Sequence, residues 1–107
     1  MMRIYVSGAI RHDPDHRTKF ARARNLVLSQ HPESVVTIPV DIAHQMHSKS
    51  SEADYLLADL ETIKTWATHL VRIAEDIPSA GADIECAFAE YAGVARLPDL
   101  EVSYGAV

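Results

Sequence analysis

An α/β fold with a mainly parallel sheet is the class that the sequence predicts, and three observations lead to it. Segments rich in β-forming residues alternate along the chain with longer segments whose apolar residues recur every three or four positions. A chain of 107 residues, 48% of them hydrophobic, suffices for one modest core, so residues 1–107 are expected to form one domain. Strands separated by helices are joined by right-handed crossovers, which make the strands parallel and place helices on both faces of the sheet.

Two strands and one helix are expected in the N-terminal part of the chain. Residues 2–7 alternate and are rich in β-formers, as a strand is. Asp15 is in place to cap a helix over residues 16–29. The apolar spacing assigns this helix an inner face of Phe20, Ala23 and Val27 and an outer, solvated face of Arg17, Lys19, Arg22 and Arg24. The β-branched run over residues 35–40 predicts the second strand.

The middle of the chain predicts a loop followed by a capped helix. Residues 41–51 are polar and without a clear period, so we expect a long loop or a frayed helix of the kind that often borders a site. Ser51 and Asp54 have the spacing of a capping box and open a helix that should end near Trp66. The expected buried face of this helix comprises Leu56, Leu57, Leu60 and Ile63.

The C-terminal part predicts a strand over residues 69–74, a turn at residues 79–81, a helix to about residue 92 and a short strand over residues 94–97. Ser79 is the expected N-cap of the helix, and Gly93 its C-cap. The spacing i, i+3, i+4, i+7 predicts a buried face made of Ile84, Ala87, Phe88 and Tyr91. Residues 100–104 are a fifth strand or a tail that docks on a partner. The expected architecture is a three-layer sandwich with four or five strands, like the flavodoxin and Rossmann folds.

Composition and charge argue against several classes of protein. A net charge of −5 argues against a general surface for DNA or RNA, and no apolar run approaches the roughly 20 residues that cross a bilayer. The single cysteine, Cys86, excludes an intrachain disulfide, suits a reducing cytoplasm, and is expected to pack as a small apolar residue. We therefore expect a cytoplasmic protein that binds neither a nucleic-acid polymer nor a membrane.

Candidate chemical groups gather at the carboxyl edge of the expected sheet, where ligands bind in open α/β folds. Tyr5 and Gly8 belong to the end of the first strand, Asp59 lies on the second long helix, and Glu85 lies near the start of the last helix, where the helix dipole favours a carboxylate. Gly81, in the turn before Glu85, permits close approach of backbone or ligand.

Two carboxyl groups and a phenol suit cleavage at the anomeric carbon of a sugar. One carboxylate attacks or stabilises the carbon, the other moves a proton or holds the sugar, and the phenol orients the first by a hydrogen bond. The residues alone leave alternatives open: Glu85 on a solvated helix turn, Asp59 as an exposed helix residue, and Tyr5 in ordinary strand packing.

Three segments, in order, resemble motifs of the nucleoside 2-deoxyribosyltransferase superfamily. They are residues 4–11, Ile-Tyr-Val-Ser-Gly-Ala-Ile-Arg; residues 58–64, Ala-Asp-Leu-Glu-Thr-Ile-Lys; and residues 79–85, Ser-Ala-Gly-Ala-Asp-Ile-Glu. The resemblance spans about residues 3 to 97 and is nearest the branch of 2'-deoxynucleoside 5'-monophosphate N-glycosidases and its small uncharacterised phage and bacterial relatives. It implies that Glu85 is the nucleophile at C1', that Tyr5 orients Glu85, and that Asp59 holds the sugar and assists proton transfer. The small-molecule partner that it implies is a nucleotide or nucleoside.

The resemblance also implies a 5'-phosphate site. Gly8, Ile10 and Arg11 match the phosphate-binding turn of the monophosphate branch, with Arg11 as a forked donor. Ser79 stands where transferases that act on free nucleosides usually have an aspartate, so a charge that repels phosphate is replaced by a hydroxyl donor. Gly81 belongs to the same third motif.

The chain also departs from the family pattern. Ala9 replaces a frequent serine, and Arg72 and Glu75 interrupt a usually apolar strand. The expected function is removal of the base from a nucleoside 5'-monophosphate; the alternatives are transfer of the sugar to another base, and a binding or sensing protein without activity. No cofactor is expected, because the histidines do not match a closed metal site and no Walker A or G-x-G-x-x-G loop occurs. A homodimer is expected, given the small core and the shared sites of the family.

Overall fold

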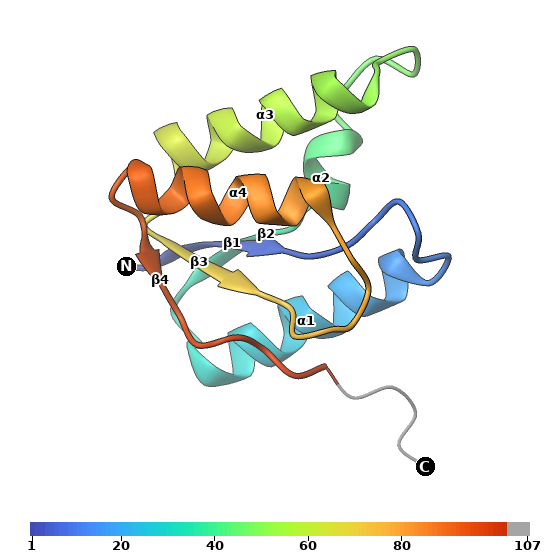
Figure 1. Ribbon diagram of the computed structural model, residues 1–107. Coiled ribbons are helices and arrows are strands. Elements are labelled where there is room, and N and C mark those ends of the chain that lie inside the picture. Colours follow the sequence, from blue (N-terminus) through green and yellow to red (C-terminus); the bar gives the residue numbers. More distant parts are fainter. Residues whose placement is uncertain (103–107) are drawn as a thin grey trace.

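The computed structural model, in which residues 1–102 are described, contains a four-stranded parallel sheet of order β2-β1-β3-β4 (Figure 1). The elements are β1 (Arg3–Ser7), α1 (His16–Gln30), β2 (Val35–Thr37), α2 (Pro39–Ala43), α3 (Glu52–Thr65), β3 (His69–Arg72), α4 (Ala80–Tyr91) and β4 (Ala95–Arg96). Strand β1 pairs with both neighbours, Tyr5 lying opposite Thr37 on one side and Leu70 on the other. The predicted three-layer α/β sandwich is confirmed. None of the helices in these residues is long and apolar enough to cross a membrane.

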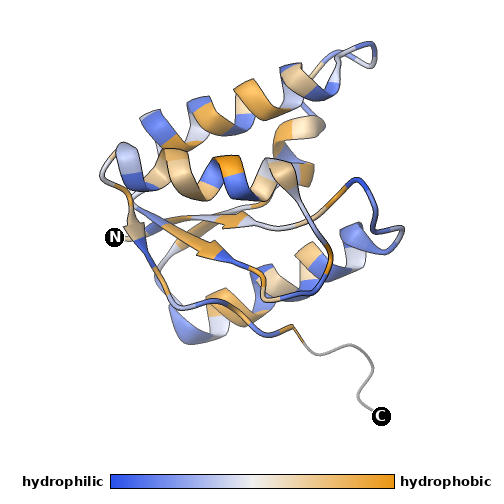
Figure 2. Ribbon diagram, viewed as in Figure 1, coloured by the Kyte–Doolittle hydropathy of each residue, from blue (hydrophilic) through white to orange (hydrophobic). Residues whose placement is uncertain are grey.

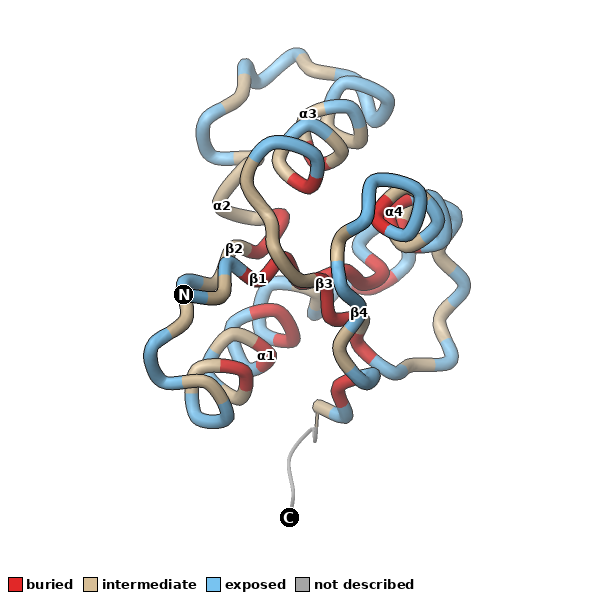
Figure 3. Tube along the Cα trace, turned by 90° about the vertical axis from the view of Figure 1, so that its left-hand side faces the viewer, coloured by how far each residue is buried: buried red, intermediate tan, exposed pale blue. Residues whose placement is uncertain are grey.

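The two faces of the sheet are covered by different helices. Helix α1 covers one face, and α3 and α4 cover the other (Figures 1 and 3). Because side chains alternate along a strand, Ile4 and Val6 point to the α1 side, and Tyr5 points to the α3 and α4 side. Strands β1 and β3 consist largely of apolar residues, whereas the loop that leads from β1 into α1 is largely polar (Figure 2).

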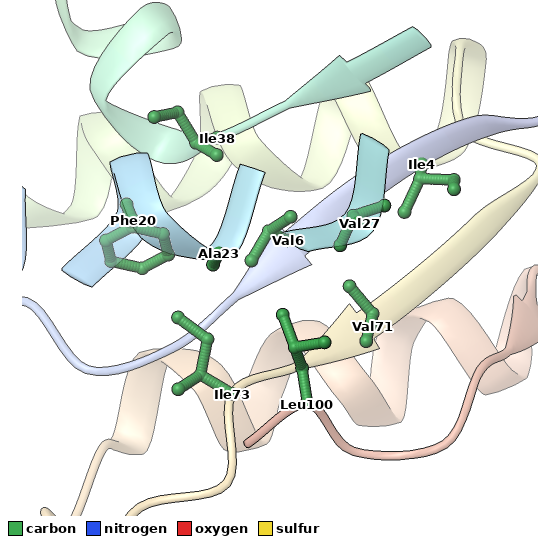
Figure 4. Packing of buried hydrophobic residues seen from close by; sticks show 9 residues of the cluster. All are labelled: Ile4, Val6, Phe20, Ala23, Val27, Ile38, Val71, Ile73 and Leu100. Carbon is green, nitrogen blue, oxygen red and sulfur yellow. The ribbon is translucent and has the colours of Figure 1, made fainter. Parts of the chain in front are cut away.

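The core on the α1 side contains the larger cluster of buried residues. Phe20, Ala23 and Val27 of α1, as predicted, pack against strand residues (Figure 4). Leu100 completes the cluster and makes an isolated parallel bridge with Ile73. Of the predicted fifth strand, residues 103 and 104 lie outside the described residues.

Two expectations for α1 are wrong. Lys19, assigned to the solvated face, is 1% exposed because two carboxylates and a carbonyl oxygen surround its ammonium group. Asp15 precedes the helix, but its side chain does not cap it; instead its backbone N–H donates to Asp13 Oδ1 at 2.9 Å. Arg24 is half-buried and pairs with Asp41 of α2.

The second strand is shorter than predicted. It ends at Thr37, and Pro39 opens α2. Proline has no N–H to continue a strand ladder, and its fixed φ suits the first position of a helix. The Asp41 side chain accepts from the Ile38 N–H at 3.4 Å and so helps to start this short helix.

Helix α3 begins as predicted. The capping box is formed, with the Asp54 N–H donating to Ser51 Oγ at 3.2 Å and the Ser51 N–H donating to Asp54 Oδ2 at 2.8 Å. Ile63 is buried and Leu56 and Leu60 are half-buried, as expected. Leu57 is 65% exposed, so its predicted burial is wrong.

Helix α4 presents a different face to the sheet from the one that its apolar spacing predicted. The buried residues are Ala82, Glu85 and Ala89. Of the predicted face, Phe88 is half-buried and packs against the cluster around Tyr5 and Leu70, whereas Ala87 is exposed, Ile84 is 45% exposed and Tyr91 is 91% exposed. The small side chains of the alanines let the helix approach the sheet closely. Between the helix and the sheet, the hydrogen-bonded carboxylate of Glu85 takes the place of an apolar contact. The expectation that Ser79 caps the helix is confirmed; the C-cap is Ala92 and not Gly93, which follows it with φ +80°. Cys86 packs with the apolar residues beside this buried face.

Candidate active site

Glu85 lies in the second turn of α4 with its carboxylate turned toward the sheet. It is 4% exposed. The Tyr5 hydroxyl donates to Oε2 at 2.8 Å, and the Ser7 hydroxyl donates to Oε1 at 2.7 Å. Both donors come from the same face of β1, because they are two residues apart on one strand. The carboxylate orientation is therefore set by two buried hydrogen bonds, and the alternatives of a solvated Glu85 and of a Tyr5 engaged only in packing are wrong.

Asp59 is the second buried carboxyl group of this region. It lies on α3, is 8% exposed, and so is not the surface residue of the alternative interpretation. Burial, together with the nearby Glu85 carboxylate, raises the pKa of Asp59 from 3.8 to about 8. Ionising both of two neighbouring buried carboxyl groups costs free energy, because the two carboxylates repel each other and lose hydration. At neutral pH the pair therefore retains a proton.

More of the surrounding groups favour the ionised form of Glu85 than that of Asp59. Burial raises the pKa of Glu85, but hydrogen bonds from Asp59, Ser7 and Tyr5 and the positive charge of Arg72 favour its ionised form. Burial and the two carboxylates raise the pKa of the Tyr5 phenol well above its usual value, so it stays a hydrogen-bond donor. A carboxylate beside a carboxylic acid is the arrangement that lets one group attack and the other donate a proton.

The two carboxyl groups line a cleft of about 750 Å³ at the carboxyl edge of the sheet. The structure brings most of the predicted site residues to this cleft: Gly8, Ile10, Arg11, Asp59, Ser79, Gly81 and Glu85. Tyr5 does not line it but lies behind Glu85, so it is a positioning residue.

The walls of the cleft differ in character. One part is polar: it is lined by residues of the loop after β1 and the start of α1, namely His12, His16 and the two cationic residues Arg11 and Arg17. Residues of α2 and α3 make another part apolar, with Pro39, Val40, Ala43, Tyr55 and Leu56. This combination suits a ligand that has a flat apolar part and an anionic part.

Three predicted binding residues have distinct surroundings. Arg11 is 72% exposed and pairs with Glu52 at 3.2 Å. A Cβ at Gly8 would lie 3.2 Å from side-chain atoms of Glu75 and Phe20, so a larger residue there would have to displace these side chains by a few tenths of an ångström. A Cβ at Gly81 would meet nothing within 4 Å, and the expected close approach at this position does not occur between described residues.

Sequence reasoning missed Ser7 and Lys19. The signal for Ser7 was its place two residues after Tyr5, which puts both side chains on the same face of the strand, toward Glu85. Lys19 carried no local signal, because its carboxylate partners include Glu75, which lies 56 residues away. Of His44 and His47, the two histidines of residues 41–51, His44 lines the cleft and His47 does not.

Within residues 1–102, no group of three or more His, Cys, Asp or Glu side chains is arranged to hold a metal ion. No known family model matches the chain, and no curated protein matches it significantly. The resemblance to the nucleoside 2-deoxyribosyltransferase superfamily therefore rests on its three motifs alone.

Proposed function

We propose that the chain is an N-glycosidase that releases the base from a nucleoside or 2'-deoxynucleoside 5'-monophosphate, with Glu85 as nucleophile. One observation carries the proposal: the buried Glu85 carboxylate is oriented by Tyr5 and Ser7 at a cleft that Asp59 also lines, and burial beside Glu85 raises the pKa of Asp59 to about 8. A nucleophilic carboxylate and a proton donor are the two groups that glycosidic cleavage requires.

The proposed reaction has two steps. Glu85 attacks C1' as the bond from C1' to the base nitrogen breaks, and the bonding pair leaves with the base, which takes the Asp59 proton. Asp59 is then a carboxylate and accepts a proton from the water that attacks C1' of the glycosyl ester. The ester bond breaks, Glu85 returns as a carboxylate, and the sugar phosphate leaves. In transfer, the alternative reaction, a second base replaces the water.

The walls of the cleft support a nucleotide as the substrate. The apolar side around Tyr55 and Val40 suits the base, and the cationic side around Arg11 suits the phosphate. The Arg11 pair with Glu52 is exposed, and such pairs contribute about 0–1 kcal/mol, so a phosphate can compete for the guanidinium. Ser79 offers a hydroxyl on the same cleft.

The proposed enzyme acts as a homodimer. Large apolar side chains exposed on α3 and α4, those of Leu57, Ile84 and Tyr91, support self-association. Sedimentation velocity tests this: a single species of twice the chain mass is expected, and a monomer at micromolar concentration would contradict it.

The test of the function is release of free base from a panel of nucleosides and their 5'-monophosphates, followed by chromatography. The inactive variant is Glu85→Gln, and the matched control is Glu90→Gln, an exposed glutamate of the same helix. Release from monophosphates by the unmodified protein and by the control, and none by Glu85→Gln, is expected. Intact mass should show a transient sugar phosphate adduct on Glu85.

Other outcomes point to the alternatives. Release from free nucleosides, with transfer to an added base, indicates a deoxyribosyltransferase. No release from any substrate, while a monophosphate still raises the melting temperature, rejects the enzyme and indicates a binding protein.

A further inference from the structure

Lys19 is a buried cation with a complete set of partners. Its Nζ lies 2.8 Å from Asp13 Oδ2 and 2.6 Å from Glu75 Oε1, and it donates to the Ala9 carbonyl oxygen at 2.7 Å. An ammonium group has three donors, and each has an acceptor here. A charge that is 1% exposed persists only when it is paired and hydrogen-bonded in this way.

The partners of Lys19 come from two loops at the same end of the sheet (Figure 1). Ala9 and Asp13 lie between β1 and α1, in residues 8–15, and Glu75 lies between β3 and α4, in residues 73–79. Glu75 also contacts the first loop directly, because its Oε2 accepts from the Ala9 N–H at 3.3 Å. It packs against Gly8, where a Cβ would lie 3.2 Å from Oε2. Glu75 therefore bridges the two loops.

Each loop contributes residues to the cleft. The first supplies Gly8, Ile10 and Arg11, and the second supplies Pro78 and Ser79. The proposed function places the 5'-phosphate between Arg11 of the first loop and Ser79 of the second. The separation of the two loops therefore decides whether donors from both can reach one phosphate group. Neither Lys19 nor Glu75 lines the cleft.

We propose that Lys19 and Glu75 are positioning residues, which hold these two loops at the separation that binds the 5'-phosphate. This inference rests on the proposed function for its substrate, but the coupling of the loops can be measured without any substrate. It also explains why an acidic residue interrupts the sequence after β3: Glu75 is the acceptor that joins this loop to Lys19.

The test compares two variants that each remove one carboxylate from Lys19. Glu75→Ala removes the bridge between the loops but leaves Lys19 paired with Asp13 and bonded to Ala9. Asp13→Ala leaves the bridge intact. Each variant keeps one carboxylate for the buried ammonium, so both are expected to fold. Glu75→Gln retains an acceptor for Lys19 and serves as the conservative rescue.

Kinetics with a nucleoside 5'-monophosphate give the first measurement. Glu75→Ala should raise KM about tenfold and change kcat less than about threefold, because it weakens phosphate binding and leaves the reacting carboxyl groups in place. Asp13→Ala should leave KM within about threefold of the unmodified protein, and Glu75→Gln should recover most of the loss.

The second measurement is amide hydrogen exchange of the protein without substrate. Glu75→Ala should accelerate exchange in residues 74–79, and Asp13→Ala should not. Equal effects of the two alanine variants on KM and on exchange, or no effect of Glu75→Ala, would overturn the inference. If the unmodified protein releases no base, the proposed function fails, and exchange alone then decides whether Glu75 couples the loops.

Discussion

The Asp59→Asn variant should gain stability relative to the unmodified protein as the pH rises from 5 to neutral and alkaline values. Asparagine has nearly the shape of a protonated aspartate and cannot ionise. Asp59 is 8% exposed and lies beside Glu85, which together raise its pKa from 3.8 to about 8. In the unfolded chain the same carboxyl group has its ordinary pKa, so folding binds a proton between these two values.

The magnitude follows from this linkage. Below about pH 4 Asp59 is protonated in both states, and its contribution to stability is fully present. As pH rises toward 8 that contribution is lost, because the folded state holds a proton that the unfolded state has released. One proton corresponds to about 1.4 kcal/mol per pH unit, so between pH 5 and 7 the stability gap between Asp59→Asn and the unmodified protein should widen by about 2–3 kcal/mol.

Urea unfolding at pH 5, 6, 7 and 8 measures this gap. Glu61→Gln, an exposed carboxylate of the same helix, is the matched control and should give a curve parallel to that of the unmodified protein. A curve for Asp59→Asn that is also parallel would refute the reasoning, since it would mean that Asp59 ionises at the same pH in the folded and unfolded states.

Two further predictions concern hydroxyl groups. Tyr5→Phe removes a donor to Glu85, and because a hydrogen bond to a charged group contributes about 1.5–3 kcal/mol, kcat/KM should fall roughly 10- to 100-fold. Loss of this hydrogen bond also raises the pKa of Glu85, so the acid limb of the pH–rate profile should move to higher pH. An acid limb at the same pH as in the unmodified protein would contradict a role of Tyr5 in holding Glu85 ionised. Ser79→Ala and Ser51→Ala each remove a helix cap and should each lower the free energy of unfolding by about 1 kcal/mol in urea titrations. Only Ser79→Ala should raise KM for a monophosphate, because only Ser79 lines the cleft; equal KM values would contradict its part in phosphate binding.

Helix α4 illustrates a limit of reasoning from periodicity. Its apolar residues are correctly spaced for one helix face, yet Ile84 and Tyr91 are exposed, and the opposite face carries Glu85 between alanines. The spacing of apolar residues identifies a helix and a set of residues that share a face, but it carries no information about the residues that contact the other face. Here a carboxylate bonded to Tyr5 and Ser7 replaces apolar burial on the sheet side.

Lys19 shows the same limit for a charged residue. A lysine among arginines in a helix is ordinarily solvated, and α1 alone contains nothing that changes this expectation. The acceptors that make its burial possible come from two loops, one of them 56 residues further along the chain. The reverse holds for capping, where Ser51 and Asp54 are three residues apart and their hydrogen bonds were predictable.

Local patterns in the sequence by themselves determined the parallel α/β architecture, the helix caps at Ser51 and Ser79, and the inner face of α1, because each depends on residues close together in the chain. The candidate groups Tyr5, Asp59 and Glu85 were also identified there. Only the tertiary structure decided that Glu85 and Asp59 are both buried and that burial raises the pKa of each, since a pKa depends on the solvent and charges around a group. It likewise decided that Lys19 joins two loops, because contacts between distant segments exist only once the chain has folded.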